Sequence, residues 1–215
     1  MTSATQTLES ELATHVHGRV PRDLRRRQLL AIAVELFAER GYAAASMDEI
    51  AARAGVTKPV IYSIFGSKDG VLLAAIDELG TELNQGVRAA VAGRTDPAEL
   101  LRAGSLAFFR MVGERHPVWT MVFGLSPDSA PGATERLEAI RRRQDALVAA
   151  VLRDSARKLG GEPDPIELSA VTRALNGVHE GLVGWWAEHP EVEPERLTDW
   201  VMGLVLPGLE AMAAS

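Results

Sequence analysis

Apolar residues recur at helical spacing along most of the chain, and glycine and proline residues interrupt the pattern at intervals. Leu29, Ala33 and Leu36, for example, lie three or four positions apart, as they do on one face of an α-helix. No stretch alternates apolar and polar residues in the way that is typical of a β-strand. The predicted helices cover residues 22–40, 46–54, 58–65, 68–92, 97–115, 118–123, 134–159, 165–188 and 194–212. The pattern therefore predicts an all-α protein of about nine helices.

Residues 46–68 predict two short helices that are joined by a tight turn. Ser46 and Glu49 have the spacing of a capping box, which indicates the start of the first helix. Gly55 can end that helix because glycine enters the left-handed backbone region without a steric cost. Thr57 can cap the second helix by accepting a hydrogen bond from a free backbone N–H. Proteins often use such a helix-turn-helix to enter the major groove of DNA.

The second of these helices has one apolar and one polar side. Ile61 and Phe65 lie four positions apart, share one face and are expected to be buried. The residues expected to point outward are Lys58, Pro59, Tyr62 and Ser63. The alternative is a pair of packed helices without a ligand, since the apolar residues would serve either purpose.

The stretch from Gln28 to Leu72 resembles the DNA-binding domain of the TetR (tetracycline-repressor-like) family. The matching positions are Leu29-Leu30, Leu36-Phe37, Gly41-Tyr42, Ser46, Ile50-Ala51, Ala54-Gly55-Val56-Thr57, Ile61-Tyr62, Phe65, Ser67-Lys68 and Leu72. Two positions depart from the family pattern. Ile64 stands where relatives usually have a histidine or another aromatic residue. Gly70 replaces an acidic residue, so the following helix loses part of its capping box.

The resemblance implies which outward residues contact DNA. Lys58, Pro59 and Ser63 would face base edges, and Tyr62 would give its hydroxyl to a phosphate. Lys68 would hold a phosphate at the start of the next helix. The expected partner is thus double-stranded DNA carrying a palindromic operator.

Other residues of this region are expected to meet the DNA backbone. Ser46 and Thr57 would direct the free amides of two helix N-termini toward phosphate oxygens. Arg25 and Arg26, within the cluster Arg22–Arg27, would hold the backbone from the flank. The alternative for any one of these arginines is a solvated surface charge.

The charge distribution fits a basic head on an acidic body. The chain of 215 residues has a net charge of −6. Residues 19–68 hold nine Lys or Arg against five Asp or Glu, a net of +4, which leaves −10 for the remainder. Because salt screens charges beyond about 8–10 Å, the head can still meet phosphate locally. The expected organisation is a flexible arm over residues 1–20, a DNA-binding domain over 21–67 and an effector-binding and dimerisation domain over 68–215.

Several classes of protein are excluded by what the sequence lacks. Cysteine is absent, so neither a disulfide framework nor a thiolate metal site can form, which suits the cytoplasm. No apolar run approaches the roughly 18 residues of a membrane span, and the N-terminus has no signal-peptide pattern. The sequence has no nucleotide-binding glycine loop and no nucleophile elbow, and a partial match at His179-Glu180 lacks its second histidine because residue 183 is Val. We therefore expect no enzyme activity, no metal and no cofactor.

The last two predicted helices contain residues that suit a helix–helix interface. Gly177, Gly181 and Gly184 lie three or four positions apart and would let another backbone come close. The following helix has an apolar stripe that contains Leu197, Trp200, Val201 and Leu204. The resemblance implies that these two helices pair with their copies in a homodimer. The alternative is that they complete the core of a monomer.

The middle of the chain is rich in aromatic and methionine side chains. The resemblance implies a pocket for a small effector, with the candidates Phe108, Met111, Trp119, Phe123, Asn176, His179 and Trp185. Further polar candidates are His116, Thr120 and Glu180. The alternative is an ordinary hydrophobic core. If a pocket exists, we expect an apolar or aromatic effector that releases a repressor from its operator; the competing functions are an activator or a protein-interaction dimer without an effector.

Overall fold

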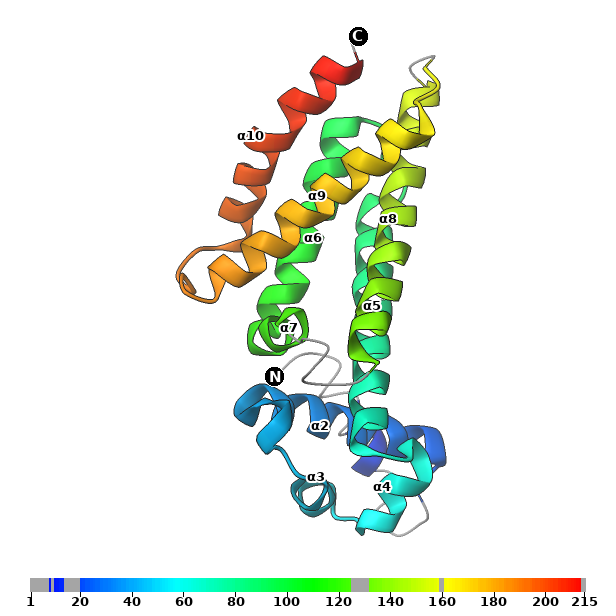
Figure 1. Cartoon of the computed structure of the whole chain (residues 1–215), viewed down its shortest axis with the longest axis vertical. Helices are drawn as coiled ribbons and strands as arrows, with labels where there is room; N and C mark the ends of the chain where they lie inside the picture. The colour runs from blue at the N-terminus through cyan, green and yellow to red at the C-terminus, as the bar shows by residue number, and fades with distance from the viewer. Residues whose placement is uncertain (1–7, 9, 14–19, 125–131, 159–160, 214–215) are drawn as a thin grey trace. The chain divides into compact units, whose positions relative to one another are not determined.

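The computed structural model describes residues 8, 10–13, 20–124, 132–158 and 161–213. Within these residues the chain forms nine helices with assigned bounds and no strand, which confirms the predicted fold class (Figure 1). The helices are α2 (Arg22–Ala44), α3 (Met47–Ala54), α4 (Lys58–Phe65), α5 (Lys68–Val91), α6 (Pro97–Glu114), α7 (His116–Phe123), α8 (Ala133–Lys158), α9 (Pro165–Trp186) and α10 (Pro194–Ala213).

Two helix ends show how local rules act in this chain. The first long helix is predicted to end at residue 40, and the backbone of the next residue, Gly41, does leave the helical region, with φ 76° and ψ 156°, although helical residues continue to Ala44. Helix α7 begins at His116, two residues earlier than predicted, with Pro117 in its first turn. Proline is tolerated there because first-turn amides have no partner within the helix.

The chain divides into two compact units. The first unit contains residues 1–78 and 124–136, and the second contains residues 79–123 and 137–215. Helices α5 and α8 therefore each contribute residues to both units. The division into functional domains at residues 20 and 67 remains a prediction.

The core of the first unit is formed by α2, α3, α4 and the start of α5. Its fully buried side chains include Leu29, Leu36 and Phe37 from α2, Ile50 from α3 and Ile61 from α4. These residues are those of the predicted apolar faces. Their burial fixes α4 against α3 and α2 and leaves the opposite side of α4 in solvent.

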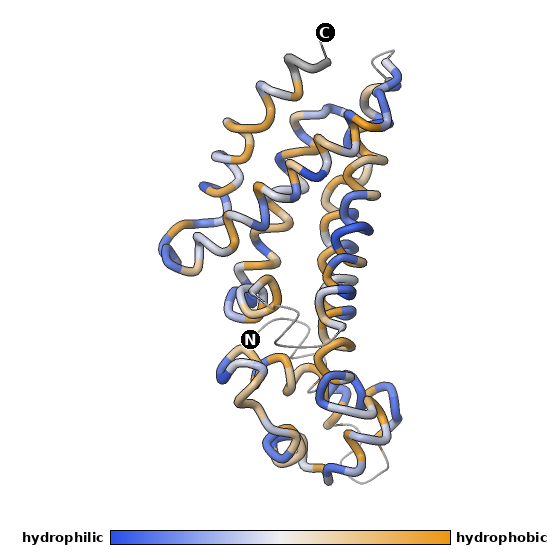
Figure 2. Tube along the Cα trace, viewed as in Figure 1, coloured by the Kyte–Doolittle hydropathy of each residue, from blue (hydrophilic) through white to orange (hydrophobic). Residues whose placement is uncertain are grey.

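The core of the second unit is formed by α6, α7, α9 and α10 with the remainder of α5 and α8. Phe109 and Val112 of α6 and Leu197 and Val201 of α10 are fully buried, because α10 packs along α6. Two ion pairs flank this contact, Arg102–Asp199 at 2.8 Å and Arg110–Glu195 at 2.6 Å. Figure 2 shows that hydrophobic residues are frequent along α10, whereas much of α8 is hydrophilic.

Only part of the predicted N-terminal arm is described. Residues 10–13 are helical, and the carboxylate of Glu11 pairs with Arg27 at 2.9 Å. Apart from residues 8 and 20, the rest of the predicted arm lies outside the described residues, as does most of the predicted loop between residues 124 and 132.

Candidate nucleic-acid interface and ligand cavity

The turn between α3 and α4 forms as the sequence predicts. The Oγ of Ser46 accepts a hydrogen bond from the backbone N–H of Glu49 at 3.1 Å at the start of α3. Gly55 ends α3 in the left-handed region with φ 63° and ψ 35°, where a side chain would be strained. Thr57 occupies the position before α4, as expected.

The hydroxyl of Thr57 does not cap α4, which corrects the predicted role of this side chain. A capping oxygen accepts from the second or third N–H of a helix. The second residue is Pro59, which has no N–H, and the third, Val60, donates to the backbone carbonyl of Thr57 at 3.0 Å. Both usual donors are therefore unavailable to the exposed hydroxyl.

Helix α4 exposes the four side chains that were expected to point outward. Lys58, Pro59 and Ser63 are exposed, and Tyr62 has 46% of its surface accessible. The Oγ of Ser63 donates to the carbonyl oxygen of Val60 at 2.7 Å. The polar groups of this face thus stand on one side of a helix that is anchored through the fully buried Ile61.

Phe65 is half-buried rather than buried, which corrects the expectation for this residue. The guanidinium of Arg26 lies 5.7 Å from the centre of its ring, so a cation covers the part of the ring that the core does not. Arg26 also pairs with Glu78 at 3.5 Å. The predicted DNA contact at Arg26 would have to compete with both partners.

Lys58 is held by an acid of the preceding helix. Its Nζ lies 2.7 Å from a carboxylate oxygen of Asp48. This hydrogen bond and the charge of Asp48 raise the pKa of Lys58, so the side chain is a cation at neutral pH. A DNA phosphate or base edge would meet Lys58 in competition with Asp48.

Most other arginines of the first unit have acidic partners as well. Arg40 pairs with Glu49 at 3.1 Å, and Arg53 pairs with Glu39 at 2.6 Å. By contrast, Arg25 donates to the neutral side chain of Gln28. The predicted flanking contacts therefore differ, since Arg25 has a neutral partner and Arg26 an acidic one.

Lys68 is held at the junction of α2 and α5. Its Nζ donates to the carbonyl oxygen of Ala43 at 3.1 Å and lies 4.5 Å from the centre of the Tyr42 ring. The hydroxyl of Tyr42 donates to the carboxylate of Asp69. Partial burial and this carboxylate raise the pKa of Tyr42, which therefore remains a neutral hydrogen-bond donor. Sequence reasoning named Lys68 but missed that Tyr42 and Asp69 orient it.

The departure from the family pattern at residue 70 has a structural reason. A Cβ atom added to Gly70 would lie 2.0 Å from the backbone carbonyl oxygen of Phe65, so a larger residue would force the chain to move. The helix start keeps its cap, because the Oγ of Ser67 accepts from the N–H of Gly70 at 2.9 Å.

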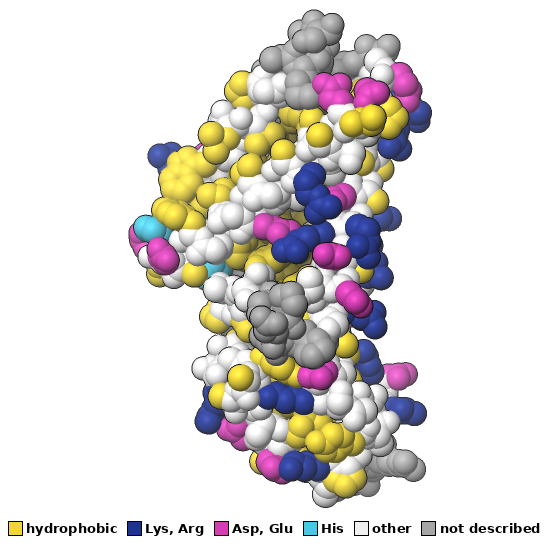
Figure 3. All heavy atoms as spheres, in the orientation of Figure 1, with side chains coloured by type: hydrophobic (Ala, Val, Ile, Leu, Met, Phe, Trp, Pro, Cys, Tyr) yellow, Lys and Arg dark blue, Asp and Glu magenta, His cyan; other side chains and the backbone are white. Residues whose placement is uncertain are grey.

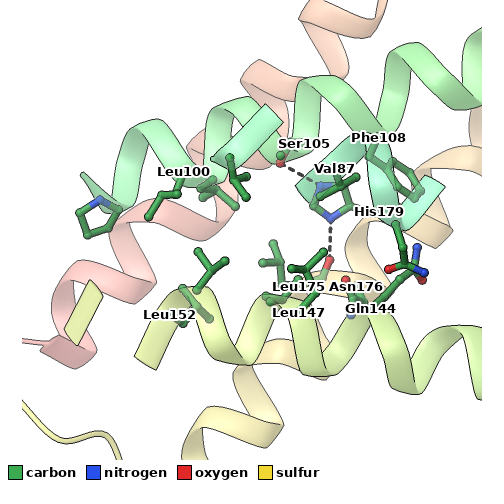
Figure 4. Close-up of a pocket in the computed structure, with 17 residues that line it drawn as sticks. Val87, Leu100, Ser105, Phe108, Gln144, Leu147, Leu152, Leu175, Asn176 and His179 are labelled. Atoms are coloured by element: carbon green, nitrogen blue, oxygen red, sulfur yellow. Dashed lines mark hydrogen bonds between the residues drawn. The ribbon is translucent and has the colours of Figure 1, made fainter. Parts of the chain in front are cut away.

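The second unit contains a cavity of about 90 Å³ between α5, α6, α8 and α9. Figure 4 shows Leu100 and Leu152 toward one end and Gln144, Asn176 and His179 toward the other. Most of the wall is aliphatic, and none of the lining residues is an Asp, Glu, Lys or Arg. The cavity suits an apolar molecule.

His179 forms the centre of the polar end. Its Nδ1 lies 2.8 Å from the carbonyl oxygen of Leu175, and its Nε2 lies 2.9 Å from the Oγ of Ser105 (Figure 4). A carbonyl only accepts, so Nδ1 carries the proton and Nε2 accepts from the hydroxyl of Ser105. Burial lowers the pKa of His179, so the ring is neutral. Phe108 and Phe109 pack against it with ring centres 5.1 and 5.3 Å away.

Three of the predicted pocket residues line this cavity, namely Phe108, Asn176 and His179. The other four, Met111, Trp119, Phe123 and Trp185, do not. Met111 packs against Gly86, and Trp119 stacks on Phe123 with ring centres 5.6 Å apart. Trp185 is 37% exposed and stacks on His189.

The additional polar candidates have partners away from this cavity. The ring of His116 packs against Trp186, and Thr120 donates to the carbonyl of His116. Glu180 pairs with Arg141 at 2.8 Å. The candidates named from the sequence did not include the α8 wall of the cavity, which is formed by Gln144, Leu147, Val148, Val151 and Leu152.

The outer face of α9 carries the three glycines of the predicted interface. Gly177, Gly181 and Gly184 are exposed, and a Cβ added to any of them would meet no other atom within 4 Å. Leu204 of α10 is 71% exposed, and Trp200 is half-buried. Figure 3 shows hydrophobic side chains gathered over α9 and α10 on this face.

Two residues of the predicted interface belong to the interior instead. Leu197 and Val201 are fully buried. They lie on the side of α10 that packs along α6, so they are not available to a partner chain in this structure.

The described residues also bear on membrane and metal sites. No single helix among them is both long and apolar enough to cross a membrane; α4 and α5 satisfy length and composition only as a pair that is bent by 59°. The apolar residues of that pair, such as Ile61 and Leu72, are buried in the first unit. No group of three or more acidic or histidine side chains among the described residues is placed to hold a metal ion.

Comparison with known proteins identifies the family. The sequence profile described as "Bacterial regulatory proteins, tetR family" matches residues 29–75. The HTH-type transcriptional activator FasR of Mycolicibacterium smegmatis is 41% identical over 139 residues, which are 64% of each chain. The HTH-type transcriptional regulator EthR of the same species is 30% identical over 200 residues, which are 92% of this chain and 90% of EthR.

The fold also matches solved structures. FadR from Bacillus subtilis, solved in complex with stearoyl-CoA, has a TM-score of 0.74 at 18% identity over 83% of this chain and 96% of FadR. The chain belongs to the TetR family and is a DNA-binding transcription regulator with a helix-turn-helix. This family consists of regulators rather than enzymes, in agreement with the prediction.

Proposed function

We propose that this protein is a cytoplasmic homodimeric repressor that leaves a palindromic operator when a small apolar effector enters the cavity of the second unit. The observation that carries the proposal is the course of α5. Its first residue, Lys68, lies next to the helix-turn-helix, and its residues Asn84, Val87 and Val91 line the cavity. One continuous helix thus contributes to both binding regions.

At the operator, the exposed side of α4 enters the major groove. Lys58, Pro59 and Ser63 meet base edges, and Tyr62 donates to a phosphate, in keeping with their exposure in the free protein. Lys58 exchanges the carboxylate of Asp48 for a group on the DNA.

The DNA backbone is held around this reading helix. The helix N-termini at Ser46 and Thr57 face phosphates, and Lys68 binds a phosphate beside the start of α5. Arg25 and Arg26 hold the flank. Arg25 contributes more than Arg26, because Arg26 would first have to leave Glu78.

Two chains pair through the outer faces of α9 and α10. The exposed glycines Gly177, Gly181 and Gly184 allow close approach, and Leu204 and Trp200 supply apolar surface. Glycine in a helix interior costs about 1 kcal/mol relative to alanine, which a close-packed partner would offset. Two reading helices related by a two-fold axis fit the two halves of a palindrome.

The effector lies with its apolar body in the cavity. FadR, whose fold is similar, has been solved with stearoyl-CoA, a ligand with a long apolar chain. The aliphatic wall of the cavity in this chain supports a ligand with an apolar body.

Release follows if the effector favours a spacing of the two reading helices that the operator does not fit. A ligand shifts a conformational equilibrium only by its different affinity for the two states. Half-sites lie about 34–36 Å apart on one face of the duplex, so a change of a few ångströms at each α5 is enough to prevent simultaneous contact.

Fluorescence anisotropy with labelled DNA from upstream of the protein's own gene tests the proposal. We expect tight binding at low salt that weakens steeply as salt rises, and release on addition of an apolar ligand. Val148→Trp, which fills the cavity, should retain operator binding and lose the response to ligand. Ala89→Trp, on the exposed face of α5, should retain both. Binding to operator that no apolar ligand changes would contradict the effector role.

A second candidate function is transcriptional activation. FasR, which is 41% identical over 139 residues, is an activator. Transcription in vitro from the bound promoter separates the two functions. A repressor lowers transcript yield and ligand restores it, whereas an activator raises transcript yield.

A further inference from the structure

An open groove of about 860 Å³ lies beside the ligand cavity, on the side where α5 faces α8. The two hollows share the lining residues Asn84, Val91, Leu100, Leu147 and Val151. These shared side chains therefore form part of the wall between the groove and the cavity.

The close approach of α5 and α8 at one point sets where the groove begins. A Cβ atom added to Gly80 would lie 2.5 Å from the Cδ1 of Ile140, so the two helices touch there. Beyond this contact the groove is lined by α5 from Thr81 onward and by α8 from Arg143 onward. The groove thus opens between α5 and α8 on one side of their contact at Gly80 and Ile140.

The charges of the groove differ from those of the cavity. Three arginines line the groove, Arg88 on α5, Arg143 on α8 and Arg94 after α5, against one acid, Asp154. Arg94 lies 3.7 Å from Glu99, whereas the side chains of Arg88 and Arg143 have no hydrogen bond or ion pair among the described residues. Figure 3 shows basic side chains gathered over α8. A cationic groove therefore adjoins a neutral, largely aliphatic cavity.

We infer that the effector of the proposed function is an anionic amphiphile, whose apolar chain fills the cavity and whose carboxylate or phosphate group lies in the groove on Arg88 and Arg143. The inference rests on the proposed effector role of the cavity. An anion cannot lie inside the cavity, because burial of an unpaired charge is costly and none of the lining residues is a cation. Guanidinium groups bind carboxylate and phosphate through paired N–H donors, so the groove offers what the cavity lacks.

The two parts of the site set the orientation of the ligand. The aliphatic residues Leu147 and Val151 belong to both hollows, so a chain that enters beside Arg143 stays in apolar contact from groove to cavity. The ionised group stays in partly solvated surroundings, where two arginines replace lost water. An uncharged chain gains the same burial without the arginine contacts.

Direct binding to the purified full-length protein tests this arrangement. Decanoate, decanoyl coenzyme A and uncharged methyl decanoate share one short chain but end in a carboxylate, a phosphate-bearing group and a neutral ester. Isothermal titration would be performed with the native protein, with Arg88→Gln, Arg143→Gln and the double variant, and with Arg142→Gln as control. Arg142 is exposed on α8 beside Arg143, pairs with Glu138 at 3.8 Å and does not line the groove.

The inference predicts that at least one anionic ligand binds about tenfold more tightly than methyl decanoate, and that this advantage shrinks with added salt. The double variant should lose the advantage while binding methyl decanoate as the native protein does, and Arg142→Gln should behave as native. Stronger binding of decanoate identifies a carboxylate ligand, and stronger binding of decanoyl coenzyme A identifies a phosphate-bearing one.

Two other results overturn the inference and differ in what they imply for the effector role. Equal binding of all three ligands, unchanged in the double variant, refutes the anionic group but leaves an apolar effector in the cavity. No binding of any of the three refutes both the anionic amphiphile and the proposed filling of the cavity by an apolar chain. Circular dichroism of the variants, whose changed side chains are exposed, would establish that they are folded.

Discussion

The proposed reading face of α4, formed by Lys58, Pro59, Tyr62 and Ser63, and the cavity of the second unit differ in composition. The reading face consists of exposed polar groups on a helix, and its one cation, Lys58, is already paired with Asp48. The cavity consists of buried aliphatic side chains with a small neutral polar end at His179 and Asn176. Binding at the first region is therefore governed by charge and hydrogen bonds and varies with salt, whereas the contribution of the cavity itself to ligand binding is governed by burial and shape. Mutations should separate the two.

The largest effect is expected for Ile61→Ala. Ile61 is fully buried beneath the reading face, so its truncation should lower the free energy of unfolding by roughly 2–5 kcal/mol. Helix α4 would lose the main apolar contact that holds it in place, so operator binding should be abolished. Urea denaturation followed by circular dichroism measures the free energy of unfolding, and isothermal titration calorimetry measures the affinity for ligand. Ligand affinity that falls together with operator affinity would show that the two regions are not separable.

A nearly equal effect on operator binding is expected for Gly181→Arg. The position is exposed with no atom near its Cβ, so the single chain should fold, but a large side chain should block the proposed pairing. Loss of one of two half-sites should weaken operator binding about a hundredfold or more. Analytical ultracentrifugation should show a monomer. Ala89→Arg, an exposed alanine of α5, adds the same charge and should remain a dimer. A dimeric Gly181→Arg would place the interface elsewhere.

An intermediate effect concerns pH and the cavity. Burial lowers the pKa of His179 in the folded protein, so the unfolded chain takes up a proton first as pH falls below about 6.5. The stabilisation that comes from keeping His179 neutral is therefore fully present above about pH 6.5. It is lost as the pH falls toward the lowered pKa of the folded protein. The stability difference between native protein and His179→Leu should shrink by up to about 1.4 kcal/mol per pH unit below pH 6.5. A difference that grows on acidification would mean that His179 is charged when folded.

Smaller effects distinguish two contacts on the reading face. Tyr62→Phe removes a proposed phosphate contact, so operator and random DNA should weaken about equally. Ser63→Ala removes a proposed base contact, so discrimination between them should fall by roughly 1 kcal/mol. Competition anisotropy measures both. If neither change alters binding, α4 is not the reading helix.

The smallest effect is expected for Asp48→Asn, which releases Lys58 from its acidic partner. Exposed ion pairs are weak, so affinity for random DNA should rise by no more than about fivefold. The salt dependence of that affinity should steepen, because one more cation is free for phosphate. Glu39→Gln, which releases Arg53 instead, offers a comparison away from α4. Equal affinity for native protein and Asp48→Asn would mean that the pair already opens freely.

The parts of the fold that follow local rules could be predicted from the sequence. The cap at Ser46 and the end of α3 at Gly55 could be predicted because each depends on only a few neighbouring residues. Thr57 shows the limit of such rules. Its hydroxyl does not cap α4 because Pro59 has no N–H and the N–H of Val60 already donates to the backbone carbonyl of Thr57.

Features that depend on which helix lies next to which could not be predicted from periodicity. The apolar stripe of α10 indicated burial but not the burying partner, so Leu197 and Val201 were assigned to an interface although α6 covers them. The same holds for the cavity. Leu147 and Val151 lie four positions apart on one side of α8, but the hollow beside them depends on the spacing of α8 from α5, α6 and α9, which helical periodicity does not give.

The distance between the two helix-turn-helix regions of the proposed dimer tests the account most directly. The chain has no cysteine, so Glu35→Cys on the exposed side of α2 provides one spin-label position per head. Pulsed electron paramagnetic resonance would measure the label-to-label distance with operator bound and with an apolar ligand bound. The account predicts two distances that differ by at least a few ångströms, with the operator-bound distance lost on addition of ligand. The same distance in both states, with ligand shown to be bound, would contradict it.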